Sequence, residues 1–371
     1  MAENSVTLYG RLSVGYVYES VKIPTDNALI NAEVTNPRTG TNNQFEMASS
    51  YAPGGSHWGM KGSEDLGNGL KASFALESAT INTTNGNWSG FGRLAYLELS
   101  KSSWGSVRLG RDYTAGSNMV SGIDPFGASW GFANGNNSMG VISVNQPNMI
   151  KYTTPSFSGA QAAISYSTEG TTVYNGDTGA QVSEAAFGTS NKNRYLSIGL
   201  RYANGPVLVA GSYDMVSPAN NAANTSPKVW MLGGTYDFKV AKLHGAFGQN
   251  IDGITSGSPV GDSLGLNGAF GVTVAGSIAA QGVRTTNWLI GASAPVGEAG
   301  QVLLSFQQQI PGGDLDQADS SFSTQSIVGL GYLYSMSKRT QLYASVNYVN
   351  NLYMLDGVKG TQVGAGIIHR F

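Results

Sequence analysis

Side chains that could catalyse a reaction or hold a metal are scarce in this chain. The 371 residues include three histidines and no cysteine. His57, His244 and His369 are far apart in the sequence and are expected on different strands, so we expect no metal site. A serine-type hydrolase needs a Ser–His pair oriented by an Asn or an acid, and none of these histidines has a persuasive partner. We therefore expect no catalytic site and no cofactor.

Charge and composition exclude further classes. The 21 Lys and Arg residues are balanced by 23 Asp and Glu, which is not the basic excess of a nucleic-acid-binding protein. Charged residues make up 12% of the chain and there are 51 glycines, whereas soluble domains carry roughly 25% charge and about 7% Gly. The 10% aromatic content argues against disorder. The absence of a run of about 18 apolar residues excludes a transmembrane helix.

The elements that would position functional side chains are strands, because apolar and polar residues alternate with a period of two. Leu196 and Leu200 face one way, for example, while Ser197 and Arg201 face the other. We predict sixteen such strands, with ends uncertain by a few residues. They lie at about 5–17, 56–62, 69–81, 92–100, 105–112, 148–155, 159–168, 195–204, 206–215, 228–237, 241–250, 285–294, 299–310, 323–335, 339–349 and 361–371.

Short and long connections alternate between these strands. The short ones lie at 64–69, 101–105, 156–159, 204–206, 239–241, 295–300 and 336–339, and the longest at about 18–55, 113–147, 168–194 and 250–284. Short turns at one end and long loops at the other are typical of a bacterial outer-membrane barrel. The sequence therefore predicts an all-β fold, in which residues 1–371 form a single domain, a sixteen-stranded antiparallel transmembrane β-barrel.

The last strand supports this prediction, because it ends on an aromatic residue. Val363, Ile367 and Phe371 fall on one face, and residues such as Gly364 and Arg370 fall on the other. About ten residues is the length that a tilted strand needs to cross a bilayer. A polar inner face of this size cannot be a packed core, since unpaired buried polar groups are costly, so we expect a wet lumen.

Several segments resemble the general porins of Gram-negative bacteria. Residues 6–11 resemble their opening strand, and residues 58–72 resemble their second strand, turn and third strand. Gly110-Arg111-Asp112-Tyr113 and Asp124-Pro125-Phe126-Gly127 resemble the entry and tip of the porin third loop. Residues 334–344 and the terminal His369-Arg370-Phe371 are similar to the β-proteobacterial branch. The resemblance implies a trimeric, sixteen-stranded, water-filled channel whose third loop, here about 113–147, folds inward and narrows the pore.

The resemblance also implies which residues line the constriction, because in this family cations on the barrel wall face acids on the inward loop. The matching wall cations are Arg11, Lys61 and Arg93, and the loop acid is Asp124. Alternation alone adds three further inward cations, Lys71, Lys151 and Arg201. Fixed charges in a narrow passage set its ion preference, because Coulomb energies grow as the effective dielectric falls.

Two positions depart from the family pattern. His57 and Asn145 stand where wall arginines are common. Arg111 lies in a basic motif of the family but falls on the apolar face, so a bulge near Gly110 would be needed to turn it inward. Wall cations still outnumber loop acids, so we expect a mild anion preference. His57 would make that preference depend on pH, since imidazole titrates near neutrality.

The leading hypothesis is passive diffusion of ions and small hydrophilic solutes through a homotrimer surrounded by outer-membrane lipid and lipopolysaccharide. One alternative is a channel selective for a sugar or an organic acid. Trp130 and Phe132 could stack on sugar rings, although packing of the loop against the wall is the more common role. A barrel enzyme is a weaker alternative. The N-terminal Met1-Ala2 is not a signal peptide, so we expect an exported protein whose signal has been replaced by an initiator Met.

Overall fold

The structure is a computed structural model. It describes residues 5–25, 39–48, 51, 54–79, 81–88, 90–127, 129–140, 145–170, 192–218, 225–254, 272–274, 277–317 and 322–371. Met1, Ala2 and parts of all four of the longest predicted loops lie outside these residues.

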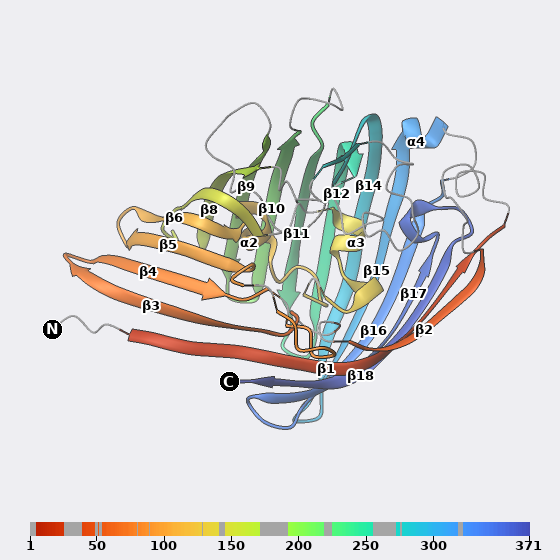
Figure 1. Cartoon of the computed structure of the whole chain (residues 1–371), viewed down its shortest axis with the longest axis horizontal. Coiled ribbons are helices and arrows are strands. Elements are labelled where there is room, and N and C mark those ends of the chain that lie inside the picture. The colour runs from red at the N-terminus through yellow and green to blue at the C-terminus, as the bar shows by residue number, and fades with distance from the viewer. Residues whose placement is uncertain are drawn as a thin grey trace, which may run out of the picture.

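In the described residues, sixteen antiparallel strands form a closed barrel (Figure 1). They are β1 (Ser5–Ile23), β3 (His57–Gly67), β4 (Leu70–Glu77), β5 (Leu94–Lys101), β6 (Gly105–Tyr113), β7 (Asn145–Thr153), β8 (Ala160–Gly170), β9 (Lys192–Asn204), β10 (Val207–Ser217), β11 (Lys228–Asp237), β12 (Lys242–Ile254), β14 (Ser277–Val296), β15 (Gly300–Gly313), β16 (Gln325–Ser335), β17 (Thr340–Asn350) and β18 (Lys359–Arg370). Each predicted strand overlaps one of them, so the predicted fold is confirmed.

The barrel is closed by the two ends of the chain. Strand β18 pairs with β1, from Arg11 opposite Arg370 to Lys22 opposite Lys359. At the chain end, the N–H of Gly10 donates to the carbonyl of Phe371 and the N–H of Phe371 donates to the carbonyl of Gly10, each at 3.1 Å. The terminal strand thus closes the barrel.

Two further strands lie in segments that the sequence pattern assigned to loops. Strand β1 is longer than the predicted 5–17, and β3 pairs only with its first part, residues 5–11. Strand β2 (Gly40–Ala48) pairs with the rest of β1, from Gly15 opposite Ala48 to Ile23 opposite Gly40. The short β13 (Val272–Val274) pairs with β14. Both strands lengthen the sheet at the end of the barrel where the sequence predicted long loops.

The two faces of the sheet differ in the way that alternation predicted. Leu97 on β5 and Leu109 on β6 are cross-strand partners and stay 68% and 56% exposed. The adjacent pair, Glu98 and Arg108, faces the other way and forms an ion pair. A continuous apolar outer face of this kind needs an apolar surrounding, since soluble proteins seldom expose large apolar patches.

The connection between β6 and β7 lies inside the barrel (Figure 1). It contains α2 (Ala115–Val120), the 3-10 helix η1 (Gly131–Ala133) and α3 (Asn136–Met139). Helix α2 contacts β8, β9 and β10, η1 contacts β16 and β17, and α3 contacts β12, β14 and β15. We call this segment, residues 114–140, the inner loop. Outside the wall strands lie α4 (Asp314–Gln317) and the 3-10 helix η4 (Leu352–Met354).

The hydrophobic core lies between the inner loop and the barrel wall. Trp130 and Phe126 of the loop are buried with Leu303 and Tyr343 of the wall. Gly329 on β16 makes this docking possible, because a Cβ there would lie 2.5 Å from the Cβ of Ala133. None of the helices in the described part of the chain is long and apolar enough to cross a membrane.

Candidate pore constriction

A cavity of about 680 Å³ separates part of the inner loop from the opposite wall. Arg93, Tyr113 and Asn145 line it from the ends of the wall strands, and loop residues from 117 to 139 line much of the rest. Tyr113 and Asn145 are cross-strand partners at the ends of β6 and β7. The strand ends at which the inner loop leaves and rejoins the wall thus border the cavity.

A buried carboxylate, Glu77, organises the wall beside this cavity. Arg93 forms an ion pair with Oε1 of Glu77. The hydroxyl of Tyr9 donates to Oε2 at 2.9 Å, and Nε2 of His57 lies 3.8 Å from the same oxygen. The guanidinium of Arg93 also lies over the ring of Tyr113, 5.4 Å from its centroid, which is a cation–π distance. Arg93 is therefore held by a charge on one side and a ring on the other.

Arg11 belongs to the same cluster but forms no ion pair within the described residues. It is the cross-strand partner of His57 on β3. Its guanidinium lies directly against Gly54, a residue that lines the cavity. A Cβ on Gly54 would collide with Nη2, so a larger residue would displace the arginine. Arg11 thus places a positive charge behind the cavity wall without an ion-paired carboxylate.

Lys61 and Asp124 have other partners. The ammonium group of Lys61 lies 5.1 Å from the centroid of the Tyr9 ring. Asp124 lines the cavity, but both of its oxygens accept backbone hydrogen bonds, from the N–H groups of Phe126 and Gly135, each at 2.9 Å. The loop acid thus holds the fold of its own loop while it contributes its charge to the cavity.

The structure does not bring Arg111 and Arg201 into this cluster. The register shifts between Gly110 and Asp112, so β6 carries a bulge where one would have been needed to turn Arg111 inward. Arg111 nevertheless remains opposite Ala95, and its Nε donates to the carbonyl of Gly92. Arg201 lines a different cavity, and its Nη1 donates to the carbonyls of Met119 and Ser121 at 3.3 and 2.9 Å.

The family model described as "Gram-negative porin" matches residues 1–352 of the chain. The chain belongs to this family. An outer membrane porin protein of Bordetella pertussis is 38% identical over 390 aligned positions, which cover 100% of this chain and 95% of the relative. Outer membrane porin protein 32 of Delftia acidovorans is 29% identical, over 95% of this chain and 85% of the relative. Among solved structures, the anion-selective porin from Comamonas acidovorans has a TM-score of 0.67 and 26% identity, with each chain fully covered.

Family and fold together define the class of protein. The porin is an integral outer-membrane protein, and its activity is that of a channel rather than an enzyme. Its inner wall and inner loop therefore act on solutes by shape and electrostatic field, and no residue needs a catalytic role.

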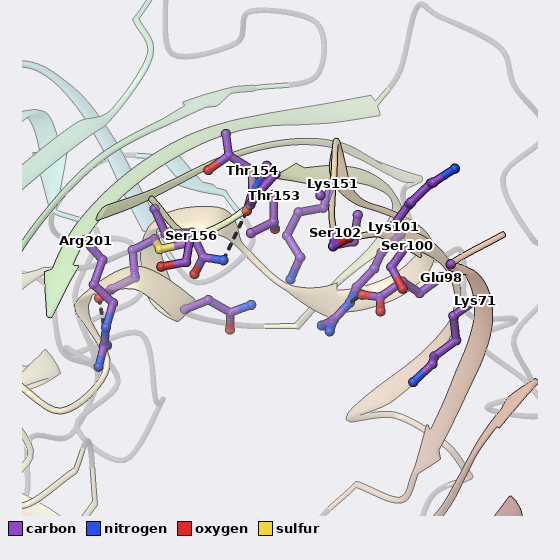
Figure 2. A pocket seen from close by; sticks show the side chains of 18 of the residues that line it. Lys71, Glu98, Ser100, Lys101, Ser102, Lys151, Thr153, Thr154, Ser156 and Arg201 are labelled. Carbon is purple, nitrogen blue, oxygen red and sulfur yellow. Dashed lines mark hydrogen bonds and ion pairs between the residues drawn. The ribbon is translucent and has the colours of Figure 1, made fainter. Parts of the chain in front are cut away.

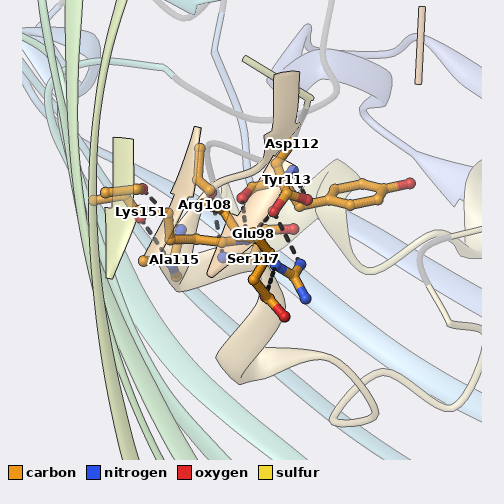
Figure 3. A network of polar contacts seen from close by, with 11 residues as sticks. Glu98, Arg108, Asp112, Tyr113, Ala115, Ser117 and Lys151 are labelled. Atoms are coloured by element: carbon orange, nitrogen blue, oxygen red, sulfur yellow. Dashed lines mark hydrogen bonds and ion pairs between the residues drawn. The ribbon is translucent and has the colours of Figure 1, made fainter. Parts of the chain in front are cut away.

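A second charged cluster of the porin lies at the start of the inner loop (Figure 3). Arg108 pairs with Glu98, and its Nη1 lies 3.0 Å from Oδ2 of Asp112. The ammonium of Lys151 lies 2.5 Å from the same oxygen, and the Lys151 side chain is 2% exposed. Lys151, predicted from alternation to face inward, thus belongs to a network of two cations and two acids in which Lys151 and Asp112 are buried and Arg108 is partly exposed.

Sequence reasoning missed Glu77 and Arg108 as members of these clusters. Alternation could have found both. Glu77 is six residues after the inward Lys71 on the same strand, and Arg108 lies between the outward Val107 and Leu109. No pattern in the sequence could have paired Glu77 with Arg93, because that contact depends on how the chain re-enters the wall after β4.

Proposed function

We propose that the chain forms a water-filled channel for ions and small hydrophilic solutes, with a mild anion preference set at the constriction. The observation that carries this proposal is the position of Arg11 against Gly54, without an ion-pair partner in the described residues. Arg93 and Asp124 line the cavity, Arg11 lies against its wall at Gly54, Glu77 pairs with Arg93, and Lys61 lies over the ring of Tyr9. Three cations thus stand against two acids. This small excess favours anions only modestly.

The comparison with solved structures supports the sign of this preference. The porin from Comamonas acidovorans is described as anion-selective, and it covers the whole of this chain at 26% identity. The cavity between wall and loop supplies the narrow, partly apolar passage in which fixed charges act strongly.

The alternative of a sugar-selective channel that uses Trp130 has less support. The ring of Trp130 is fully buried and packs edge-on against Phe126 and Tyr343, at centroid distances of 5.6 and 5.7 Å. A ring in this position holds the loop to the wall and is not open to a solute.

We also propose a homotrimer in contact with outer-membrane lipid and lipopolysaccharide, as the resemblance to general porins implies. Its apolar outer face provides surface for both kinds of contact. Gel electrophoresis of unheated and heated samples, together with conductance steps in multiples of three, would test the trimer. A single-step channel of monomer size would overturn it.

The reversal potential across a planar bilayer with a KCl gradient tests the anion preference. We expect a mild chloride preference for the native chain and a loss of that preference in Arg11→Gln. Arg339→Gln is the matched control, because Arg339 is exposed in the turn between β16 and β17. A native pore that prefers potassium, or an Arg11→Gln pore with unchanged selectivity, would contradict the proposal.

A further inference from the structure

A second cavity, of about 920 Å³, lies beside the short turns of the barrel (Figure 2). It is lined by β4 to β9 near the turns at 102–104 and 154–159, and it includes Asn118 and Ser121 of the inner loop. These two loop residues also line the constriction cavity. The turn-side cavity therefore adjoins the constriction cavity.

Three cations that line this cavity, Lys71, Lys101 and Arg201, have no carboxylate partner in the described residues. Lys71 and Arg201 lie at opposite ends of it in Figure 2, and neither forms an ion pair in the described residues. Asp65 is the cross-strand partner of Lys71, but its Oδ1 accepts a hydrogen bond from Gly67 at 2.9 Å. The guanidinium of Arg201 donates to carbonyl oxygens of the inner loop, which carry no formal charge to compensate its own.

The middle of the cavity wall holds Arg108 and Lys151, which belong to the network with Glu98 and Asp112 (Figures 2 and 3). These four charges cancel formally. The network therefore fixes the wall between Lys71 and Arg201 and adds no net negative charge that would repel an anion.

Hydroxyl groups make up much of the remaining lining. They belong to Ser100, Ser102, Ser106, Thr153, Thr154 and Ser156. A hydroxyl can donate one hydrogen bond and accept others, so a row of them can pair with the hydroxyls of a sugar. Ammonium and guanidinium groups, by contrast, are the preferred partners of a phosphate.

We propose that this cavity is a binding site for phosphorylated sugars, with the phosphate held by Lys71 or Arg201 and the sugar held by the hydroxyl row. The site lies on the inward face of the barrel, so its ligand is a solute and not a lipid headgroup. The proposal rests on the proposed channel function, because the solute must reach the lumen. It extends the proposed channel function, because it assigns a class of ligand to the turn-side cavity, outside the constriction.

The test is block of the chloride current through the full-length porin in a planar bilayer. Glucose 6-phosphate is added to one side and then to the other, and the concentration for half-block is measured, with glucose as the uncharged probe. We expect the sugar phosphate to block at much lower concentration than glucose. Lys71→Gln should weaken this block about three- to fivefold, as expected for one lost surface charge contact. Arg201→Gln should do the same.

Lys338→Gln is the matched control, since Lys338 carries the same charge in a turn at the same end but does not line the cavity. Its block should equal that of the native chain. Arg201 also donates to carbonyls of the inner loop, so its replacement could alter the pore itself. The conductance of Arg201→Gln is therefore measured without sugar phosphate. If it differs from the native value, the test of the site rests on Lys71→Gln alone. Equal block by glucose, an unchanged block in both Lys71→Gln and Arg201→Gln, or an equal weakening in Lys338→Gln would overturn the site. A native chain that gives no conductance steps would instead overturn the channel itself.

Discussion

Lys151 and Asp112 form an ion pair where the barrel wall becomes the inner loop, with Nζ 2.5 Å from Oδ2. The same lysine donates to the carbonyl of Tyr113 at 3.0 Å, and Oδ1 of Asp112 accepts from the N–H of Tyr113 at 2.7 Å. One buried pair thus holds both backbone polar groups of Tyr113, whose ring supports Arg93. Tyr113, the last residue of β6, is therefore held in place at the point where the chain leaves the wall and enters the lumen.

Lys151→Met should therefore destabilise the porin and loosen the constriction. Removing one partner of a buried pair costs about 3–5 kcal/mol, because the other charge is left uncompensated. Here Arg108 still contacts Asp112, so we expect the lower end of that range. The temperature at which the folded band is lost on a gel, and the noise of the open-channel current, measure the two effects. Lys338→Met should change neither, and a Lys151→Met porin with native melting and quiet current would contradict this account.

Gly54→Ala should reduce the anion preference, because the new Cβ would collide with the guanidinium of Arg11. Gly54 also has a φ of +79°, so part of the effect could come from backbone strain. Gly205→Ala is the matched control: its φ is +55°, but no atom lies within 4 Å of the new Cβ. The reversal potential should shift toward zero in the first variant and stay native in the second. Equal reversal potentials in both would exclude a role for the Arg11 position.

Gly329→Ala should disturb the width of the pore, because its Cβ would push against Ala133 of the inner loop. The loop can respond by moving away from β16 into the lumen, which narrows the pore, or by losing its docked conformation, which widens it. Single-channel conductance should therefore be more variable than that of the native chain. Gly245→Ala on β12 serves as the control, since the nearest atom to its Cβ is 3.9 Å away. A conductance histogram identical to the native one would show that the loop is not held at this contact.

The anion preference should increase as the pH falls below neutrality, because protonation of His57 adds a positive charge beside Arg11 and Arg93. The ring lies within reach of Glu77, so a charged form would have a partner. His57→Gln should give a permeability ratio that no longer changes over this range. His369→Gln, at a site where the ring contacts Thr340 at 2.9 Å, should keep the native pH response. If His57→Gln also keeps it, another group must titrate.

The strands of the barrel wall were predictable because the signals that mark them lie within a few adjacent residues. Period-two alternation and short turns are such signals, and they located all sixteen wall strands. Strand β2 was missed because Gly40–Ala48 is polar and mostly exposed, so it carries no apolar face to reveal it. Its pairing depends on the length of β1.

The candidate site was predictable only in part, because its charges are set by contacts between distant segments. His57 and Arg93 meet at Glu77, which was not predicted as a site residue, and Arg11 lies opposite His57 on the neighbouring strand. Arg201 was predicted as an inward, pore-lining cation, and it donates to carbonyls at the C-terminal end of α2, away from the cluster at Glu77. Which cation stays unpaired depends on how the inner loop docks on the wall, and that docking depends on glycines such as Gly329 whose neighbours are far away in sequence.

The contact between Gly10 and Phe371 also constrains how the molecule assembles. Strand β1 cannot pair with β18 until β18 has been synthesised and has reached the membrane. Until then β1 and β18 are two open sheet edges, each with unsatisfied backbone groups that invite pairing with other chains. Closure therefore joins the most distant parts of the chain, the kind of step that makes folding slow. The barrel must be kept apart from its own copies until its two ends meet.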